Sequence, residues 1–392
     1  MSEFTLAGGL SFPLITSLFF FWTAGIGVLY RVLGVPIAVV ASTLKFFIPF
    51  SFFAFWGDGS WFIGGDDRSY LEAGVRLLES GENPISVWGS PVGRYILIEH
   101  PSLALYHWWN MTWMYLFGPS YSVVVFANVF TTIISSVLTY KIARTVGLRQ
   151  NYAVALTIFF MFHWNILAWS SFLNIKEPLI LLLILANIWA FLSLERGNWL
   201  FLAPYLGSFV LLLGIRFYLP ALLGAAAAVY ILLFVKHRLL FFPIAGIGIG
   251  AICWKYWNTL SLVERLAVFE PLSFLLHLLK AMFSPLPWQV TDPALYLIVP
   301  SALNLIATPL GLFGIIIMFY FGRIRSAFFV ALIIFSGYMF YSLVPSLASV
   351  RHLFPFNALL IFFQFHLLWE FFSRGQASRD LRRDERESSF LE

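Results

Sequence analysis

Charged residues are scarce in this chain. Asp, Glu, Lys and Arg make up 11% of its 392 residues, whereas 60% are hydrophobic and 19% are aromatic. A soluble globular domain carries about 25% charged residues, so the composition argues against a water-soluble fold. The apolar runs continue for about twenty residues, the length of a membrane-spanning helix, and lack the alternating segments of about ten residues that a membrane β-barrel requires. The sequence therefore predicts an all-α polytopic membrane protein.

Cysteine and nucleotide-binding motifs are also lacking. The single cysteine, Cys253, lies in an apolar run, which excludes disulfides within the chain and cysteine-based metal sites. No glycine-rich phosphate loop, zinc motif or Ser-His-Asp pattern is present. This absence favours a membrane-dissolved substrate over a soluble nucleotide donor. The net charge of +5 is spread between the apolar runs, so it predicts topology and not nucleic-acid binding.

Eleven apolar segments are candidate spans. They cover residues 11–30, 36–56, 121–143, 151–169, 178–194, 199–215, 219–235, 239–257, 296–320, 327–345 and 352–372. Cytoplasmic loops are enriched in Lys and Arg, and this rule places 57–120 and 258–295 outside as two large outer loops. We expect residues 1–373 to form one transmembrane domain of the plasma (inner) membrane. The charged segment 374–392 would be a disordered cytoplasmic tail.

Both outer loops contain segments that we expect to lie at the membrane surface. In the first loop, Asp67 to Ser80 has apolar residues every three to four positions, which predicts an amphipathic helix. The segment from Pro101 to Phe117 is rich in Trp and Tyr, which favour the membrane–water interface. In the second loop, residues 262–283 suggest another interfacial helix.

Two adjacent carboxylates, Asp66 and Asp67, lie at the start of the amphipathic segment. A carboxylate near a low-dielectric boundary has a raised pKa, which makes it a better general base near neutral pH. Aspartate is also favoured at a helix N-cap and in the first turn. The dipeptide by itself is compatible with both a catalytic and a capping role.

Several basic residues contradict the charge rule. Lys45 lies inside a span, and the others lie on the outer side: Arg68, Arg76, Arg94, Lys176, Arg216, Lys255, Arg265, Lys280 and Arg351. Ionisable groups at membrane depth are costly and usually functional, although long side chains can also snorkel to lipid headgroups. Arginine binds phosphate oxygens through paired donors. We therefore expect outer cations to bind an anionic ligand.

Short motifs in the first outer loop carry a family resemblance. They are Gly65-Asp66-Asp67-Arg68-Ser69-Tyr70, Leu77-Leu78-Glu79-Ser80-Gly81, Glu99-His100-Pro101-Ser102-Leu103 and Leu116-Phe117-Gly118. This loop resembles that of GT-C glycosyltransferases, in the branch of protein O-mannosyltransferases and lipid A aminoarabinose transferases. The likeness continues to Lys176-Glu177 and is weaker after residue 195. The family's Lys-Pro-Pro turn is replaced here by His100-Pro101-Ser102, and an extra span precedes the Asp pair.

The resemblance implies a GT-C-like bundle of about eleven spans that transfers a sugar from a polyprenyl-phosphate carrier. The acceptor would be a glycan, lipid or protein on the extracytoplasmic face, and the anomeric centre would be inverted. In this scheme Asp66 is the general base, Asp67 positions Asp66 or the acceptor, and the departing phosphate is bound by three cations. These cations are Lys176, Arg216 and Arg351, and the further substrate-binding candidates are Arg68, Tyr70, His100, Glu177, Tyr218 and His352. A divalent cation is compatible with the scheme, but no residue is assigned to a metal.

Two other functions fit the same residues. A polysaccharide polymerase or ligase that uses polyprenyl-diphosphate glycans shares the long outer loop and the outer arginines. A lipid or glycan transporter often has two similar halves with broken helices at the midplane, but here the halves do not match. The adjacent Asp pair favours the single-sugar transferase.

Overall fold

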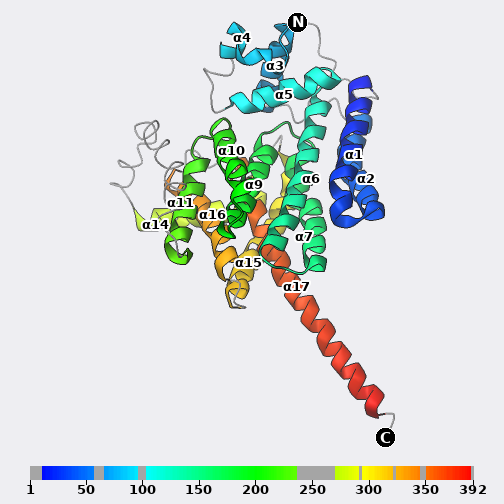
Figure 1. The fold of residues 1–392 in the computed structure, drawn as a ribbon, viewed down its shortest axis with the longest axis vertical. Coiled ribbons are helices and arrows are strands. Elements are labelled where there is room, and N and C mark those ends of the chain that lie inside the picture. The colour runs from blue at the N-terminus through cyan, green and yellow to red at the C-terminus, as the bar shows by residue number, and fades with distance from the viewer. Residues whose placement is uncertain are drawn as a thin grey trace.

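The computed structural model describes residues 11–56, 66–95, 103–235, 270–290, 294–320, 324–344 and 350–389. Within these ranges, all regular structure is helical (Figure 1). The helices of ten or more residues, together with the short α8, are α1 (Phe12–Leu33), α2 (Val35–Ser51), α3 (Asp66–Glu79), α5 (Ala104–Phe117), α6 (Tyr121–Thr145), α7 (Gln150–Phe162), α8 (Trp164–Ser170), α9 (Glu177–Glu195), α10 (Leu202–Leu213), α11 (Leu219–Phe234), α14 (Pro271–Phe283), α15 (Ile298–Tyr320), α16 (Ile324–Leu343) and α17 (Val350–Ser389).

Several of these helices are suited to a membrane. Among the described residues, six are long and apolar enough to cross it: Phe12–Leu33, Val35–Phe55, Tyr121–Thr145, Glu177–Glu195, Leu295–Tyr320 and Arg351–Ser373. A seventh span results if α7 and α8, which are bent by 45° at their break, are taken together. These helices confirm the prediction of an all-α, multi-pass membrane protein.

The predicted number of eleven spans is not confirmed. The segments 199–215 and 219–235 do form apolar helices, but α10 has 12 residues and α11 has 16. About twenty residues are needed to cross the hydrocarbon core. The predicted span 239–257 lies outside the described residues.

The centre of the bundle consists of α6 and α9. In their apolar stretches 89% and 83% of the residues are buried inside the protein, compared with 28% in α1 and 39% in α2. Because α1 and α2 are themselves strongly apolar, we infer that this peripheral hairpin faces lipid. It packs on α6 at the edge of the bundle (Figure 1).

The pair α15–α17 owes its close approach to glycine. A Cβ atom added at Gly314 would lie 2.1 Å from the carbonyl oxygen of Phe363. Small residues allow membrane helices to approach this closely, and van der Waals packing then holds them together.

A layer formed by α3 and α5 lies across one end of the bundle (Figure 1). The helix predicted from Asp67 to Ser80 is confirmed as α3, and the aromatic segment that follows is helical as α5. Their packing is tight, because a Cβ at Gly74 of α3 would lie 2.5 Å from Met114 of α5. In the segment predicted to be the second outer loop, α14 forms part of the helix predicted over 262–283.

The C-terminal segment differs from the prediction of disorder. The backbone of α17 continues as one helix to Ser389 and projects beyond the bundle at the end opposite α3 (Figure 1). Arg and Glu are good helix formers. The segment 374–389 contains five Arg and two Glu.

Candidate functional site

Most of the predicted site residues meet beneath the α3–α5 layer. They come from the first turn of α3, the segment 171–176 with the start of α9, the segment 214–218, the end of α16 and the start of α17. Residues far apart along the chain therefore form a single polar cluster at one end of an apolar bundle.

The accessible part of the cluster is an ion pair between Asp66 and Arg351. The guanidinium Nη2 of Arg351 donates a hydrogen bond to Asp66 Oδ2. The hydroxyl of Tyr70, one turn further along α3, donates to the same oxygen at 3.4 Å. The side chains of Asp66 and Arg351 are 46% and 30% exposed, so a ligand can reach both.

Asp67 occupies a different environment from its neighbour. Its side chain is buried, and this burial raises the pKa of Asp67 from 3.8 to about 7, against the attraction of Arg351. The carboxyl group therefore changes its protonation state near neutral pH. The backbone of Asp67 is fixed from the opposite side, because its carbonyl oxygen accepts a hydrogen bond from Asn174 Nδ2 at 3.3 Å.

A second ion pair, between Glu177 and Arg216, is fully buried. Arg216 Nη2 donates to Glu177 Oε1. Arg216 Nη1 donates to the hydroxyls of Tyr218 at 3.2 Å and Tyr341 at 3.4 Å, and these hydroxyls lie 2.6 Å apart. The other carboxylate oxygen, Glu177 Oε2, is buried without a hydrogen-bond partner among the described residues.

Lys176 lies beside residues that neighbour both ion pairs. It is buried, its Nζ donates to the carbonyl oxygen of Ile215 at 3.3 Å, and it lies 5.9 Å from the ring centroid of Tyr70. Burial lowers the pKa of Lys176 to about 7, and repulsion by Arg216 acts in the same direction. An anion bound beside Lys176 would restore its positive charge, because a nearby opposite charge favours the ionised form.

A buried network of amides and phenols holds these segments together. Asn174 Nδ2 donates to Asn110 Oδ1 at 2.8 Å, and Asn174 Oδ1 accepts from the Tyr106 hydroxyl at 2.8 Å. Asn128 Nδ2 donates to that hydroxyl at 3.0 Å, and the backbone N–H of Asn174 donates to the Tyr121 hydroxyl at 2.9 Å. Buried networks of this kind rigidify a site when their members are satisfied.

Sequence reasoning assigned no role to this network. A signal was available in part, because Asn128 lies within the first third of an apolar span. A buried amide in such a position needs a partner, but the sequence does not show which one. Tyr341, which binds both Arg216 and Tyr218, was missed for the same reason.

The remaining predicted binding residues are Arg68, His352 and His100. Arg68 is exposed on α3 and pairs with Glu72 at 2.8 Å. His352 is half-buried beside Tyr341, with ring centroids 6.1 Å apart. His100 lies outside the described residues.

Lys45, the cation predicted inside a span, is not part of the cluster. Its side chain is fully buried, and its Nζ donates to the carbonyl oxygen of Met161 at 3.0 Å. This carbonyl is in the last turn of α7, just before the break to α8. A cation at a helix C-terminus is favoured by the helix dipole, so the structure indicates a packing role for Lys45.

The cluster combines groups for proton transfer with groups for anion binding. It holds three carboxylates, two arginines and one lysine, and one carboxylate–arginine pair is accessible. Within the described ranges, no group of three or more His, Cys, Asp or Glu side chains is arranged to hold a metal ion.

Comparisons with models of protein families, with curated proteins and with solved structures find no match to this chain.

Proposed function

We propose that this protein is an integral membrane glycosyltransferase. It transfers a sugar from a polyprenyl-phosphate carrier to an acceptor hydroxyl on the extracytoplasmic face, with inversion at the anomeric carbon. The observation that carries the proposal is the convergence of Asp66 and Asp67 with Lys176, Arg216 and Arg351 at one end of an apolar bundle. The resemblance of the first outer loop to GT-C enzymes supports it.

In the proposed reaction, Asp66 takes the proton of the acceptor hydroxyl as its oxygen attacks the anomeric carbon. The bond between that carbon and the phosphate oxygen breaks, and its electron pair stays on the phosphate. Cations placed where this charge develops lower the barrier. Of the three candidates, Arg351 is the most accessible, whereas Arg216 is buried and bound to Glu177. Lys176 is also buried, but the acceptor of its Nζ is a backbone carbonyl oxygen and not a carboxylate. We therefore assign direct phosphate binding to Arg351 and Lys176, and positioning of Glu177 to Arg216.

The Asp66–Arg351 pair implies that the donor binds before Asp66 accepts the proton. While Arg351 is bound to Asp66 Oδ2, that oxygen is occupied by the guanidinium hydrogen bond. A donor phosphate that attracts Arg351 would free this oxygen for the acceptor proton. The base would thus become fully effective only after the donor has bound.

The test is transfer by purified protein in lipid, with a panel of radiolabelled polyprenyl-phosphate sugars. Asp66→Asn should reduce turnover at least about 100-fold, the range for loss of a general base. Glu72→Gln, on the same helix but in an exposed ion pair, should retain activity. Undiminished turnover of Asp66→Asn would remove Asp66 from the role, and no transfer from any carrier would refute the proposal. Products with many sugar units would favour the polymerase alternative.

One observation bears on the transporter alternative. The break between α7 and α8 is lined by polar groups, including the His163–Gln364 hydrogen bond of 3.0 Å and the reciprocal Asn165–Asn304 bonds of 2.9 and 2.8 Å. Broken helices mark binding sites in many transporters. Here these side chains bind one another, which supports a structural role for the break. Movement of a lipid-linked sugar across liposomes without a covalent product would favour transport.

A further inference from the structure

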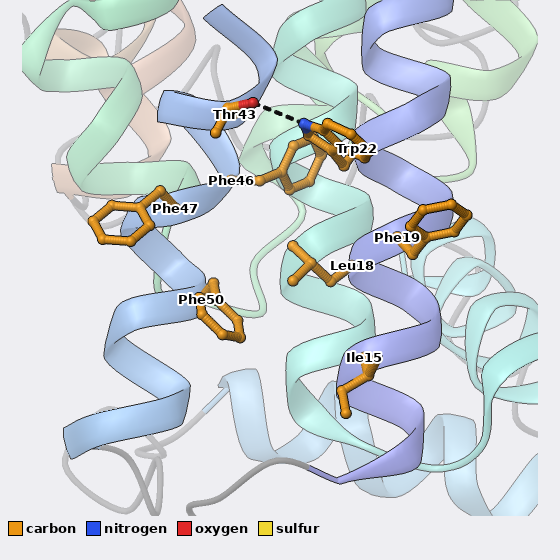
Figure 2. A pocket seen from close by; sticks show the side chains of 8 residues that line it. All are labelled: Ile15, Leu18, Phe19, Trp22, Thr43, Phe46, Phe47 and Phe50. Carbon is orange, nitrogen blue, oxygen red and sulfur yellow. Dashed lines mark hydrogen bonds between the residues drawn. The ribbon is translucent and has the colours of Figure 1, made fainter. Parts of the chain in front are cut away.

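A groove lies between α1 and α2 on the periphery of the bundle (Figure 2). Its volume is about 300 Å³, and its apolar lining includes Ile15, Leu18, Phe19, Phe46, Phe47 and Phe50. The remaining polar groups of the lining bind each other, since Trp22 Nε1 donates to Thr43 Oγ1 at 3.0 Å. The lining is thus suited to hydrocarbon and has no free partner for a polar ligand.

The groove has one closed end. At the level of Gly25 the two helices are in direct contact, because a Cβ at this position would lie 2.7 Å from Ser42 Oγ. The nearby hydrogen bond from Ser42 Oγ to the carbonyl oxygen of Trp22, 3.0 Å long, joins the helices. In Figure 2 the Trp22–Thr43 bond lies at one end of the groove, and Ile15 and Phe50 lie at the other. A chain in the groove would therefore leave it past Ile15 and Phe50.

The end near Phe50 leads towards the polar cluster. The next turn of the chain carries Phe52, whose ring centroid lies 5.1 Å from that of Phe172. Phe172 belongs to the segment that bears Lys176, and its carbonyl oxygen accepts a hydrogen bond from Tyr121 at 3.3 Å. Phe50 and Phe52 also pack against a hydrophobic cluster that includes Leu71 of α3, one turn after Asp67. The end of the groove near Phe50 therefore adjoins the segment that bears Lys176, through Phe52 and Phe172, and adjoins α3 through the cluster that contains Leu71.

We infer that the α1–α2 groove binds part of the hydrocarbon chain of the polyprenyl-phosphate donor. The groove opens to the side, where Phe19 and Phe47 are 64% and 58% exposed, so a chain can enter from the bilayer. Its volume is at the lower limit of small-molecule sites, which begin near about 300 Å³, so only a part of a long chain fits.

The donor is favoured over bulk phospholipid because of its head group. The identity of that head group rests on the proposed function. A phosphate held by Lys176 and Arg351 tethers the chain attached to it, and tethering raises the effective concentration of that chain at a neighbouring site. A phospholipid without this anchor lacks the advantage.

The test is photolabelling of the full-length protein in nanodiscs with a polyprenyl phosphate that carries a diazirine in its chain. Labelling should map to the groove, and unlabelled polyprenyl phosphate should compete with it far better than phosphatidylglycerol. Leu18→Trp and Ile15→Trp fill the groove and should each lower labelling about tenfold, equivalent to losing the burial of roughly two methylene groups. Leu44→Trp is the matched control, because Leu44 is 52% exposed on α2 outside the lining.

Two results would overturn the inference. One is equal labelling of Leu18→Trp, Ile15→Trp and Leu44→Trp in folded, monodisperse protein. The other is equal competition by phosphatidylglycerol, which would make the groove a general lipid site. Labelling is read without sugar transfer, so the two proposals fail separately. If labelling depends on the groove but the protein transfers no sugar, the groove is supported as a binding site for a polyprenyl chain and the proposed enzymatic function is not. If the protein transfers sugar but labelling does not depend on the groove, only the proposed enzymatic function is supported.

Discussion

Removing the charge of Glu177 should strongly destabilise this protein. The side chains of Glu177 and Arg216 are only 1% and 4% exposed, and Arg216 has no other carboxylate bound to it among the described residues. Breaking a buried ion pair by removing one partner costs about 3–5 kcal/mol, because the remaining charge stays buried. We therefore expect Glu177→Gln to lower the free energy of unfolding by about 3–5 kcal/mol.

The chain offers a matched control in the Arg68–Glu72 pair. Its side chains are 69% and 36% exposed, and exposed pairs contribute about 0–1 kcal/mol. Glu72→Gln should therefore change stability little. Both variants can be measured by titrating protein in mixed micelles with a denaturing detergent and following helicity by circular dichroism.

A double-mutant cycle separates the charge effect from the loss of packing. In Glu177→Gln/Arg216→Gln no uncompensated charge is left, so the combined loss should be smaller than the sum of the two single losses. Equal destabilisation by Glu177→Gln and Glu72→Gln, or strict additivity in the cycle, would refute the reasoning.

Three further predictions concern stability. Burial raises the pKa of Asp67 from 3.8 to about 7, so the protonated carboxyl group stabilises the folded protein. This contribution, roughly 4 kcal/mol at most, is complete below about pH 4 and is lost as the pH rises to 7. Asp67→Asn should flatten this part of the pH profile of the unfolding midpoint, and an unchanged slope would contradict the assignment. Asn174→Ala leaves several buried hydrogen-bond partners unpaired, at a cost of about 1–3 kcal/mol each. Detergent titration should therefore show that the free energy of unfolding falls by at least about 2 kcal/mol. A decrease below about 0.5 kcal/mol would rule out a stabilising network. Gly314→Ala places a methyl group against Phe363 and should lower the free energy of unfolding by about 1–3 kcal/mol in the same titration. Its control is Gly207→Ala, which has open space around it and should be neutral or stabilising. Equal effects of the two substitutions would argue against the close contact.

The sequence predicted which residues meet better than it predicted how they pair. Topology and composition placed Asp66 and Arg351 on the same side, although 285 residues separate them. Both were interpreted as groups facing the substrate. That Arg351 binds Asp66 directly depends on side-chain geometry, which no local pattern encodes.

Other features could not be predicted because they depend on contacts between helices. Asn174 lies in the turn before α9, and no local pattern shows that it makes four hydrogen bonds that connect α3, α5 and α6 to the site. The number of spans could not be predicted either, since hydropathy does not distinguish a full crossing from a short apolar helix such as α10. By contrast, the helical period of the apolar residues predicted α3, with each end within one residue of its position in the structure.

The lysine at position 45 has a consequence for how the chain assembles in the bilayer. Its acceptor, the carbonyl oxygen of Met161, is synthesised 116 residues later. Until then the second span carries an ammonium group with no partner from α7, and a lysine at the centre of an inserted helix costs about 2.5–3.5 kcal/mol. The α1–α2 hairpin therefore gains full stability only when α7 has been synthesised and packs against it. Correct insertion of the amino-terminal third of the protein thus depends on a helix from the middle of the polypeptide.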